Sequence, residues 1–109
     1  ARLQQQIVSG VYPPGSKLPS VRELAADGGA NPNTVQRAFA ELERAGLIYT
    51  QRTAGKFVTE DAAAVAAARR SLAEVQTRQY LAAMRALGCG KQEIHNLFDQ
   101  MEEQEHADL

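Results

Sequence analysis

The sequence predicts a mainly α-helical fold with one small β-hairpin, and three patterns along its 109 residues support this prediction. Residues 20–45 encode a short helix, a turn and a longer helix, which is the pattern of a helix-turn-helix. Residues 47–59 encode two short strands around a basic connection of the kind called a wing. Residues 61–87 contain no Gly or Pro and are rich in Ala, which predicts one long helix. We therefore expect a winged helix-turn-helix domain followed by a C-terminal α-helical hairpin.

Apolar spacing and glycine define the first helix and the connector after it. Leu3, Ile7 and Val8 recur at helical spacing. This pattern predicts an amphipathic helix over residues 1–9, which Gly10 ends. A Pro-Gly pair then predicts a tight turn, because Pro presets φ and Gly accepts a positive φ. Since the chain begins inside this helix and without Met, we expect further residues to precede it.

Both helices of the predicted helix-turn-helix begin with capping residues. Ser20 is expected to cap the first helix, and Glu23 three positions later completes a capping box. Asn31 is expected to cap the second helix, with Pro32 at its first position, where a missing N–H costs nothing. Paired glycines end the first helix, and Gly46 ends the second.

The first turns of the second helix carry polar side chains that are candidate DNA readers. In a helix-turn-helix this helix enters the major groove, where amide and guanidinium groups reach base edges and free N–H groups favour phosphate. We expect DNA contacts from three residues there: Asn33, Thr34 and Gln36. Arg37 is expected to contact phosphate, and the alternative is an ion pair with Glu41.

Further candidates flank this helix. For Asn31, a capping role and a phosphate contact carry equal weight. Arg22, on the first helix, is expected to reach the DNA backbone or a base near the groove edge rather than remain a plain surface charge.

The wing is predicted from two apolar strands, residues 47–50 and residues 57–59, and a very short strand is also expected at residues 17–18. Arg52 and Lys56 bracket the hairpin turn. A basic hairpin beside a recognition helix usually touches phosphate or the minor groove, so we expect this of both residues. The alternative is that they are ordinary surface charges of a hairpin.

Charge divides the chain into two parts. Residues 1–59 hold seven Lys or Arg against four acids, a net charge of +3. Residues 60–109 hold five bases against nine acids, a net charge of −4. This asymmetry is small enough to arise by chance, but it fits a DNA-binding domain over residues 1–59 and a two-helix dimerisation domain over residues 60–109.

The long helix over residues 61–87 measures about 40 Å at 1.5 Å per residue, more than a small winged domain covers. Gly88-Cys89-Gly90 breaks it, and a final helix follows. The larger apolar residues of both helices are expected to bury one another across a dimer interface. These are Val65, Leu72, Val75, Leu81, Met84, Leu87, Ile94, Leu97, Phe98 and Met101.

No catalytic, metal or cofactor site is predicted. His95 and His106 lie far apart in sequence, and the acidic residues near His106 fit a solvated helix end better than a metal site. Cys89 has no Cys or His partner nearby, so we expect a small apolar plug rather than a redox switch. No run approaches the roughly 20 apolar residues that span a bilayer, and no signal peptide is evident. We expect a cytoplasmic protein that is not an enzyme.

Several motifs together resemble the GntR family of bacterial winged-helix transcription regulators. They are Ile-Val-Ser-Gly at residues 7–10, Pro-Gly-Ser-Lys-Leu-Pro-Ser-x-Arg-Glu-Leu-Ala at residues 14–25, Asn-x-Asn-Thr-Val-x-Arg-Ala at residues 31–38 and Glu-Leu-Glu-x-x-Gly at residues 41–46. The short tail after Thr59 resembles the YtrA-type subfamily, whose tail mainly dimerises.

The resemblance implies DNA contacts from a set of residues in the helix-turn-helix and the wing: Ser20, Arg22, Asn33, Thr34, Gln36, Arg37, Arg52 and Gly55. One departure concerns Thr53, which stands where relatives commonly have glycine in the wing. A stiffer wing tip is expected from this change, while Lys56 adds a charge.

The combined expectation is a homodimeric repressor that binds an inverted-repeat DNA operator as two winged domains held by the C-terminal helices. One alternative is a sensor of an apolar small-molecule effector, with a pocket lined by Met84, Leu87, Leu97 and Phe98. Another is a winged-helix module that contacts proteins instead of DNA.

Overall fold

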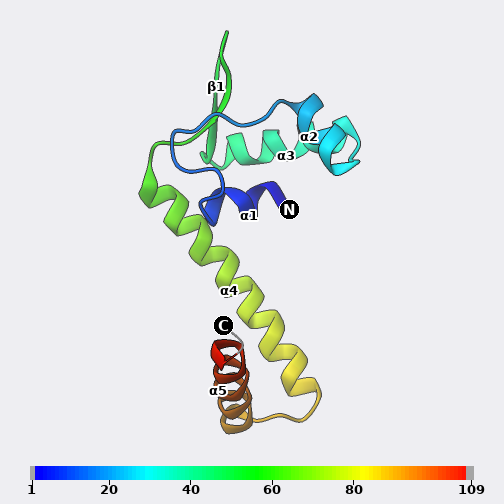
Figure 1. The fold of residues 1–109 in the computed structure, drawn as a ribbon, viewed down its shortest axis with the longest axis vertical. Helices are drawn as coiled ribbons and strands as arrows, with labels where there is room; N and C mark the ends of the chain where they lie inside the picture. The colour runs from blue at the N-terminus through cyan, green and yellow to red at the C-terminus, as the bar shows by residue number, and fades with distance from the viewer. Residues whose placement is uncertain (1, 108–109) are drawn as a thin grey trace. The chain divides into compact units, whose positions relative to one another are not determined.

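Five helices and one two-stranded hairpin make up residues 2–107, the part of the chain that this computed structural model describes (Figure 1). The elements follow the predicted order: α1 (Arg2–Val8), α2 (Val21–Gly28), α3 (Pro32–Arg44), β1 (Ile48–Gln51), β2 (Gly55–Val58), α4 (Ala62–Ala86) and α5 (Lys91–Ala107). The largest boundary difference is in β2, which begins at Gly55 rather than at residue 57. The mainly helical winged fold predicted from the sequence is confirmed.

The chain forms two compact units, Ala1–Ser71 and Leu72–Leu109, which we call unit 1 and unit 2. The boundary falls within α4, twelve residues after the predicted division at residue 59. The first turns of α4 belong to unit 1 because α4 follows β2 directly and its first large apolar residue meets the winged core. The functional division at residue 59 stays a prediction.

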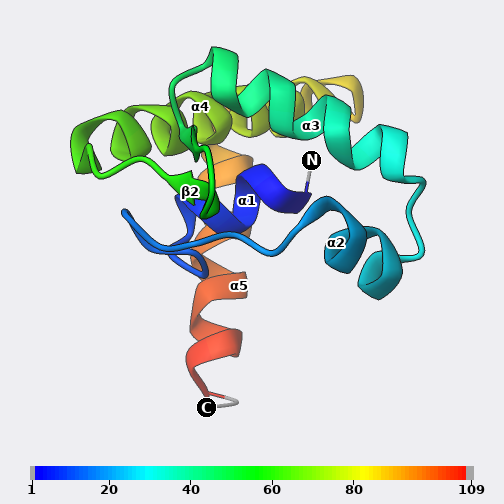
Figure 2. The same cartoon turned by 90° about the horizontal axis from the view of Figure 1, so that it is seen from above.

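The core of unit 1 lies where α1, α2, α3, the hairpin and the start of α4 meet. Here α1 lies beneath α3, with α2 on one side and the hairpin on the other (Figure 1 and Figure 2). Ile7 and Val58 are fully buried at its centre. Val65, which the sequence assigned to the dimer interface, is instead a member of this core and only 9% exposed. The full set is Leu3, Ile7, Leu18, Ala25, Val35, Phe39, Leu42, Leu47, Ile48, Val58 and Val65.

The hairpin is a regular antiparallel pair whose two faces differ. Ile48 lies opposite Val58, and both side chains enter the core. On the other face the rings of Tyr49 and Phe57 stack with centroids 5.7 Å apart. The short strand expected at residues 17–18 is a single bridge that joins residue 17 to Phe57.

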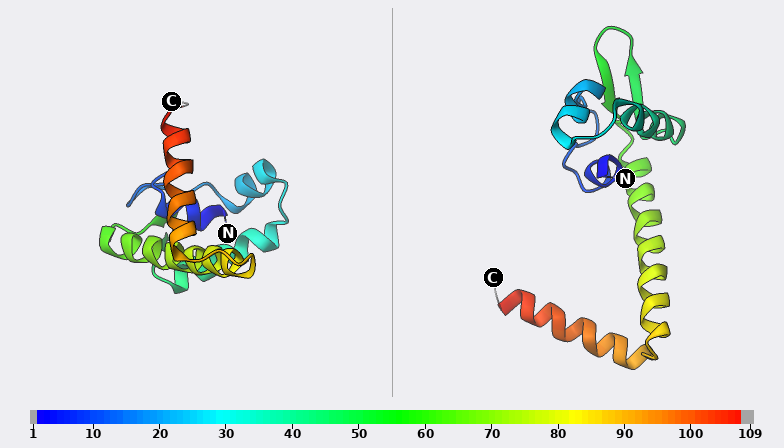
Figure 3. Two further views of the ribbon diagram at one scale, coloured as in Figure 1. Left: turned by 90° about the horizontal axis from the view of Figure 1, so that it is seen from below. Right: turned by 90° about the vertical axis from the view of Figure 1, so that its right-hand side faces the viewer.

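Unit 2 contains the C-terminal part of α4, a turn and α5. The turn contains Gly88, whose φ of +88° favours glycine. The two predicted helices are present and spread apart from the turn (Figure 3). Ile94 is the only buried residue of α5. The space between the helices is an apolar groove lined by Ala73, Gln76, Thr77, Tyr80, Leu81, Met84, Leu97, Phe98 and Met101.

Candidate nucleic-acid interface

Side-chain caps fix the starts of the two helices that form the candidate interface. The N–H of Glu23 donates to Ser20 Oγ over 3.1 Å, and the N–H of Ser20 donates to Glu23 Oε1 over 3.2 Å. This is the predicted capping box. In α3 the N–H of Asn33 donates to Asn31 Oδ1 over 2.8 Å, with Pro32 in the first turn. Asn31 therefore caps α3, and a phosphate contact from it stays a prediction.

Replacing Ser20 by alanine is expected to lower the free energy of unfolding by about 1 kcal/mol, because the Glu23 N–H loses its acceptor. Urea unfolding followed by circular dichroism measures the change. Ser71→Ala, at an exposed position inside α4, is the matched control and should leave stability nearly unchanged. Equal stabilities of both variants and the wild type would contradict the capping role.

One face of α3 is buried and the opposite face is open to solvent. Val35, Phe39 and Leu42 enter the core. The predicted readers are all exposed, and within residues 2–107 their side chains have no hydrogen-bond or ion-pair partner in the chain; they are Asn33, Thr34, Gln36 and Arg37. Their donors and acceptors are therefore available to another molecule.

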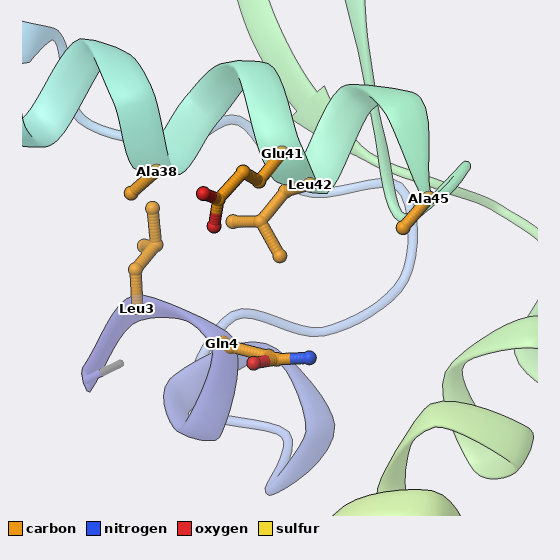
Figure 4. A pocket seen from close by; sticks show the side chains of 6 residues that line it. All are labelled: Leu3, Gln4, Ala38, Glu41, Leu42 and Ala45. Atoms are coloured by element: carbon orange, nitrogen blue, oxygen red, sulfur yellow. The ribbon is translucent and has the colours of Figure 1, made fainter.

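Arg37 does not form the alternative ion pair with Glu41 within the described residues. Figure 4 shows why, because the Glu41 carboxylate is directed toward α1, into a small pocket that Leu3 and Leu42 also line. The Arg37 side chain is exposed and is therefore accessible to a partner outside the chain. Arg22 is likewise exposed on α2, whose neighbouring residues Val21 and Leu24 pack against the core.

The tip of the wing is exposed at Arg52 and Thr53. Two residues later, Gly55 has a φ of +109°, a backbone conformation that residues other than glycine rarely adopt. A Cβ at Gly55 would lie 3.3 Å from Cε of Lys17, so Lys17 lies alongside the wing. Lys17 is not among the DNA contacts predicted from the sequence, although a basic residue on the short strand expected at residues 17–18 could have indicated it.

Lys56 differs from the other candidate cations because its ammonium lies against the protein. Its Nζ donates to Thr50 Oγ1 over 2.8 Å and lies 3.6 Å from Glu43 Oε1. The Thr50 hydroxyl in turn donates to the same Glu43 oxygen. This hydrogen bond, aided by the charge of Lys56 and opposed by partial burial, holds the pKa of the Glu43 carboxyl below its ordinary value.

Unit 2 holds the histidines and the cysteine that were weighed as metal or redox candidates. No cluster of three His, Cys, Asp or Glu side chains is placed to hold a metal ion in residues 2–107. His106 lies 3.8 Å from Glu102, one helical turn away. Burial and the nearby Glu93 raise the pKa of the Cys89 thiol, which disfavours the reactive thiolate. Over the same residues, no helix is long and apolar enough to cross a membrane.

Comparison with known proteins agrees with this geometry. The sequence pattern of the family described as "Bacterial regulatory proteins, gntR family" matches residues 1–58. The chain belongs to the GntR family. It is therefore a DNA-binding transcriptional regulator of the helix-turn-helix type, and its family is one of regulators rather than enzymes.

Two relatives of this GntR regulator come from Bacillus subtilis. The HTH-type transcriptional regulator YhcF is 41% identical over 81 residues, covering 74% of this chain and 67% of YhcF. The HTH-type transcriptional repressor YtrA is 49% identical over 61 residues, covering 56% of this chain and 47% of YtrA. The chain thus spans about half the length of YtrA. The predicted likeness to YtrA is confirmed.

A solved structure of a GntR family transcriptional regulator from Listeria monocytogenes matches most of the regulator. Its TM-score is 0.84 at 39% sequence identity, over 91% of this chain and 87% of the Listeria chain. Because the match extends well past residue 58, it includes the C-terminal helices as well as the winged domain.

Proposed function

We propose that this GntR regulator is a homodimeric repressor that binds an inverted-repeat operator. The observation that carries the proposal is the exposed, unpartnered polar face at the start of α3. A repressing role is supported by the relative YtrA, which is itself a transcriptional repressor. The operator symmetry would follow from the two-fold symmetry of the dimer.

In this proposal α3 enters the major groove with its N-terminal turns. Asn33 and Gln36 would read base edges, since amide side chains can bond two positions of one base. Thr34 and Arg37 would contact phosphate beside them. Ser20, which caps α2, and Arg22, on α2, would contact phosphate as well. The wing would approach the DNA backbone or the minor groove with Arg52 and Gly55, and Lys17 would do so from beside the wing. We assign these roles from exposure and charge.

The dimer would form through the groove of unit 2, with α5 of a second copy as its occupant. Several large apolar side chains at or near this groove are exposed in the single chain, among them Phe98 at 58%, Met101 at 55% and Tyr80 at 45%. Because removing apolar surface from water is favourable, a cluster of exposed apolar side chains favours burial of this surface in an interface.

Charge supports this occupant. The helix α4 carries four Arg against one Glu, whereas α5 carries five Asp or Glu against one Lys. An α5 helix from a second copy would therefore bring opposite charge to α4 as well as an apolar stripe. Of the residues predicted for dimerisation, the groove contains Leu81, Met84, Leu97, Phe98 and Met101. We leave Val65 out of the interface because it is buried in unit 1.

Footprinting on the promoter of the protein's own operon tests the proposed function. Hydroxyl-radical cleavage is expected to reveal two protected patches on one face of the DNA, with centres about 10 base pairs or a multiple of that apart. Deleting the gene should raise transcription from that promoter. A single protected patch would contradict the symmetric dimer, and a fall in transcription would contradict repression.

Sensing of an apolar small molecule is the second candidate function. The groove of unit 2 contains Met84, Leu97 and Phe98, and it adds polar groups from Gln76 and Tyr80 that would orient a ligand. Leu87, also predicted for such a pocket, is 77% exposed and lies outside the groove. If the regulator senses such a molecule, its operator affinity should change when a small-molecule extract of cells is added. An unchanged affinity would contradict this function.

A further inference from the structure

The hairpin places Thr50 and Lys56 over α3. Alternate residues of a strand face the same side. Ile48 and Val58 form a pair whose side chains are buried in the core. Two residues further out, Thr50 lies opposite Lys56, so their side chains extend the same face beyond the core. This face looks onto the C-terminal half of α3.

The matching groups on α3 are Phe39 and Glu43, one helical turn apart on one side of the helix. Lys56 Nζ lies 5.8 Å from the centroid of the Phe39 ring, within the range of a cation–π contact. It also contacts Glu43 and Thr50 at the distances given above. The ammonium thus has three partners, and the Lys56 side chain is only 29% exposed. We call Glu43, Thr50 and Lys56 the wing brace.

A lysine that neutralises a DNA phosphate needs a charge that is free to face the DNA. The charge of Lys56 is compensated by the Glu43 carboxylate, whereas Lys17 and Arg52 have no ion-pair partner within residues 2–107. An isolated two-stranded hairpin is only marginally stable, so a wing of four residues per strand needs contacts to the body of the domain. The brace supplies such contacts at the point where the hairpin leaves the core.

We propose that Lys56 is a positioning residue that holds the wing at a fixed place beside α3, and that it is not one of the phosphate contacts. The inference rests on the proposed operator binding and changes the role predicted for Lys56 from the sequence. Its consequence is that an acidic residue, Glu43, supports DNA binding. Fixing the wing lowers the ordering cost when Arg52 and α3 dock on the duplex together.

Operator affinity as a function of salt distinguishes positioning from phosphate contact. We expect Lys56→Met and Glu43→Ala each to weaken operator binding about two- to fivefold. The slope of log K against log salt should stay the same, because no phosphate contact is lost. The double variant should be no weaker than either single variant. Lys17→Gln is the comparison for a phosphate contact and should reduce the slope by about one.

Glu41→Ala is the matched control for charge. It removes the same charge from the same helix, but the Glu41 carboxylate is directed toward α1 rather than the wing (Figure 4). We expect this control to bind DNA as well as the wild type or slightly better. Tighter binding by Glu43→Ala, or a slope reduced by about one in Lys56→Met, would overturn the positioning role. Wild-type affinity in both brace variants would also overturn it.

Amide hydrogen exchange tests the brace without DNA, so it remains informative if the proposed operator binding fails. Both brace variants should exchange the hairpin amides faster than the wild type while the amides of α3 near Val35 stay protected. Unchanged hairpin exchange would show that the brace does not hold the wing. Absence of operator binding by the wild type would instead contradict the proposed function.

Discussion

Alanine at Asn33 or at Gln36 is expected to reduce discrimination between the operator and scrambled DNA by about 1–3 kcal/mol, which is roughly 5- to 150-fold in relative affinity. Both side chains are exposed on the first turns of α3 and have no partner within the described chain. Truncation leaves the base edges that they would contact without a bonding partner. Binding to scrambled DNA should change little, because phosphate contacts supply most of it.

Fluorescence anisotropy with operator and scrambled duplexes at one salt concentration measures both affinities. Gln79→Ala, at an exposed position on α4, is the control for loss of an amide side chain away from α3. We expect it to retain the discrimination of the wild type. If both α3 variants keep the full operator preference, Asn33 and Gln36 do not read bases.

Aspartate at Leu81 is expected to convert the dimer into a monomer at micromolar concentration. Leu81 is half-buried on the wall of the unit 2 groove, where α5 of the second copy is proposed to pack. Burying a carboxylate there without a partner costs several kcal/mol. This cost is a large part of the roughly 8 kcal/mol of binding free energy that holds a micromolar complex together. Operator affinity should fall as well, because a monomer engages one half-site.

Light scattering coupled to size-exclusion chromatography measures the mass of the particle. Ala82→Asp adds the same charge one residue further along α4, at an exposed position outside the groove, and should remain dimeric. Circular dichroism checks that both variants keep their helices. A wild-type protein that is monomeric at micromolar concentration, or a dimeric Leu81→Asp variant, contradicts the proposed interface.

The order and type of the elements could be predicted from the sequence because the deciding signals are local. The capping box joins Ser20 to Glu23, three positions later, and the cap joins Asn31 to Asn33, two positions later. Glycine ends helices through its own backbone, as at Gly46 with a φ of +79°. Such signals do not depend on what the rest of the chain does.

The surroundings of Val65 and Lys56 are set by packing between segments that are distant in the sequence. Val65 has the same helical spacing as the interface candidates, but its position after β2 places it in the winged core. Lys56 has the charge expected of a phosphate contact, but the hairpin register and the face of α3 place it beside Glu43. Neither arrangement is visible in residue type or spacing, because both are set by which side chains the fold brings together.

Selection of binding sites from random double-stranded oligonucleotides, at moderate salt, tests the central claim most directly. Because a two-fold dimer presents two copies of α3, the selection should enrich an inverted repeat. Its half-site centres should lie about 10 base pairs, or a multiple of that, apart. Enrichment of no symmetric site would contradict operator recognition by a two-fold dimer.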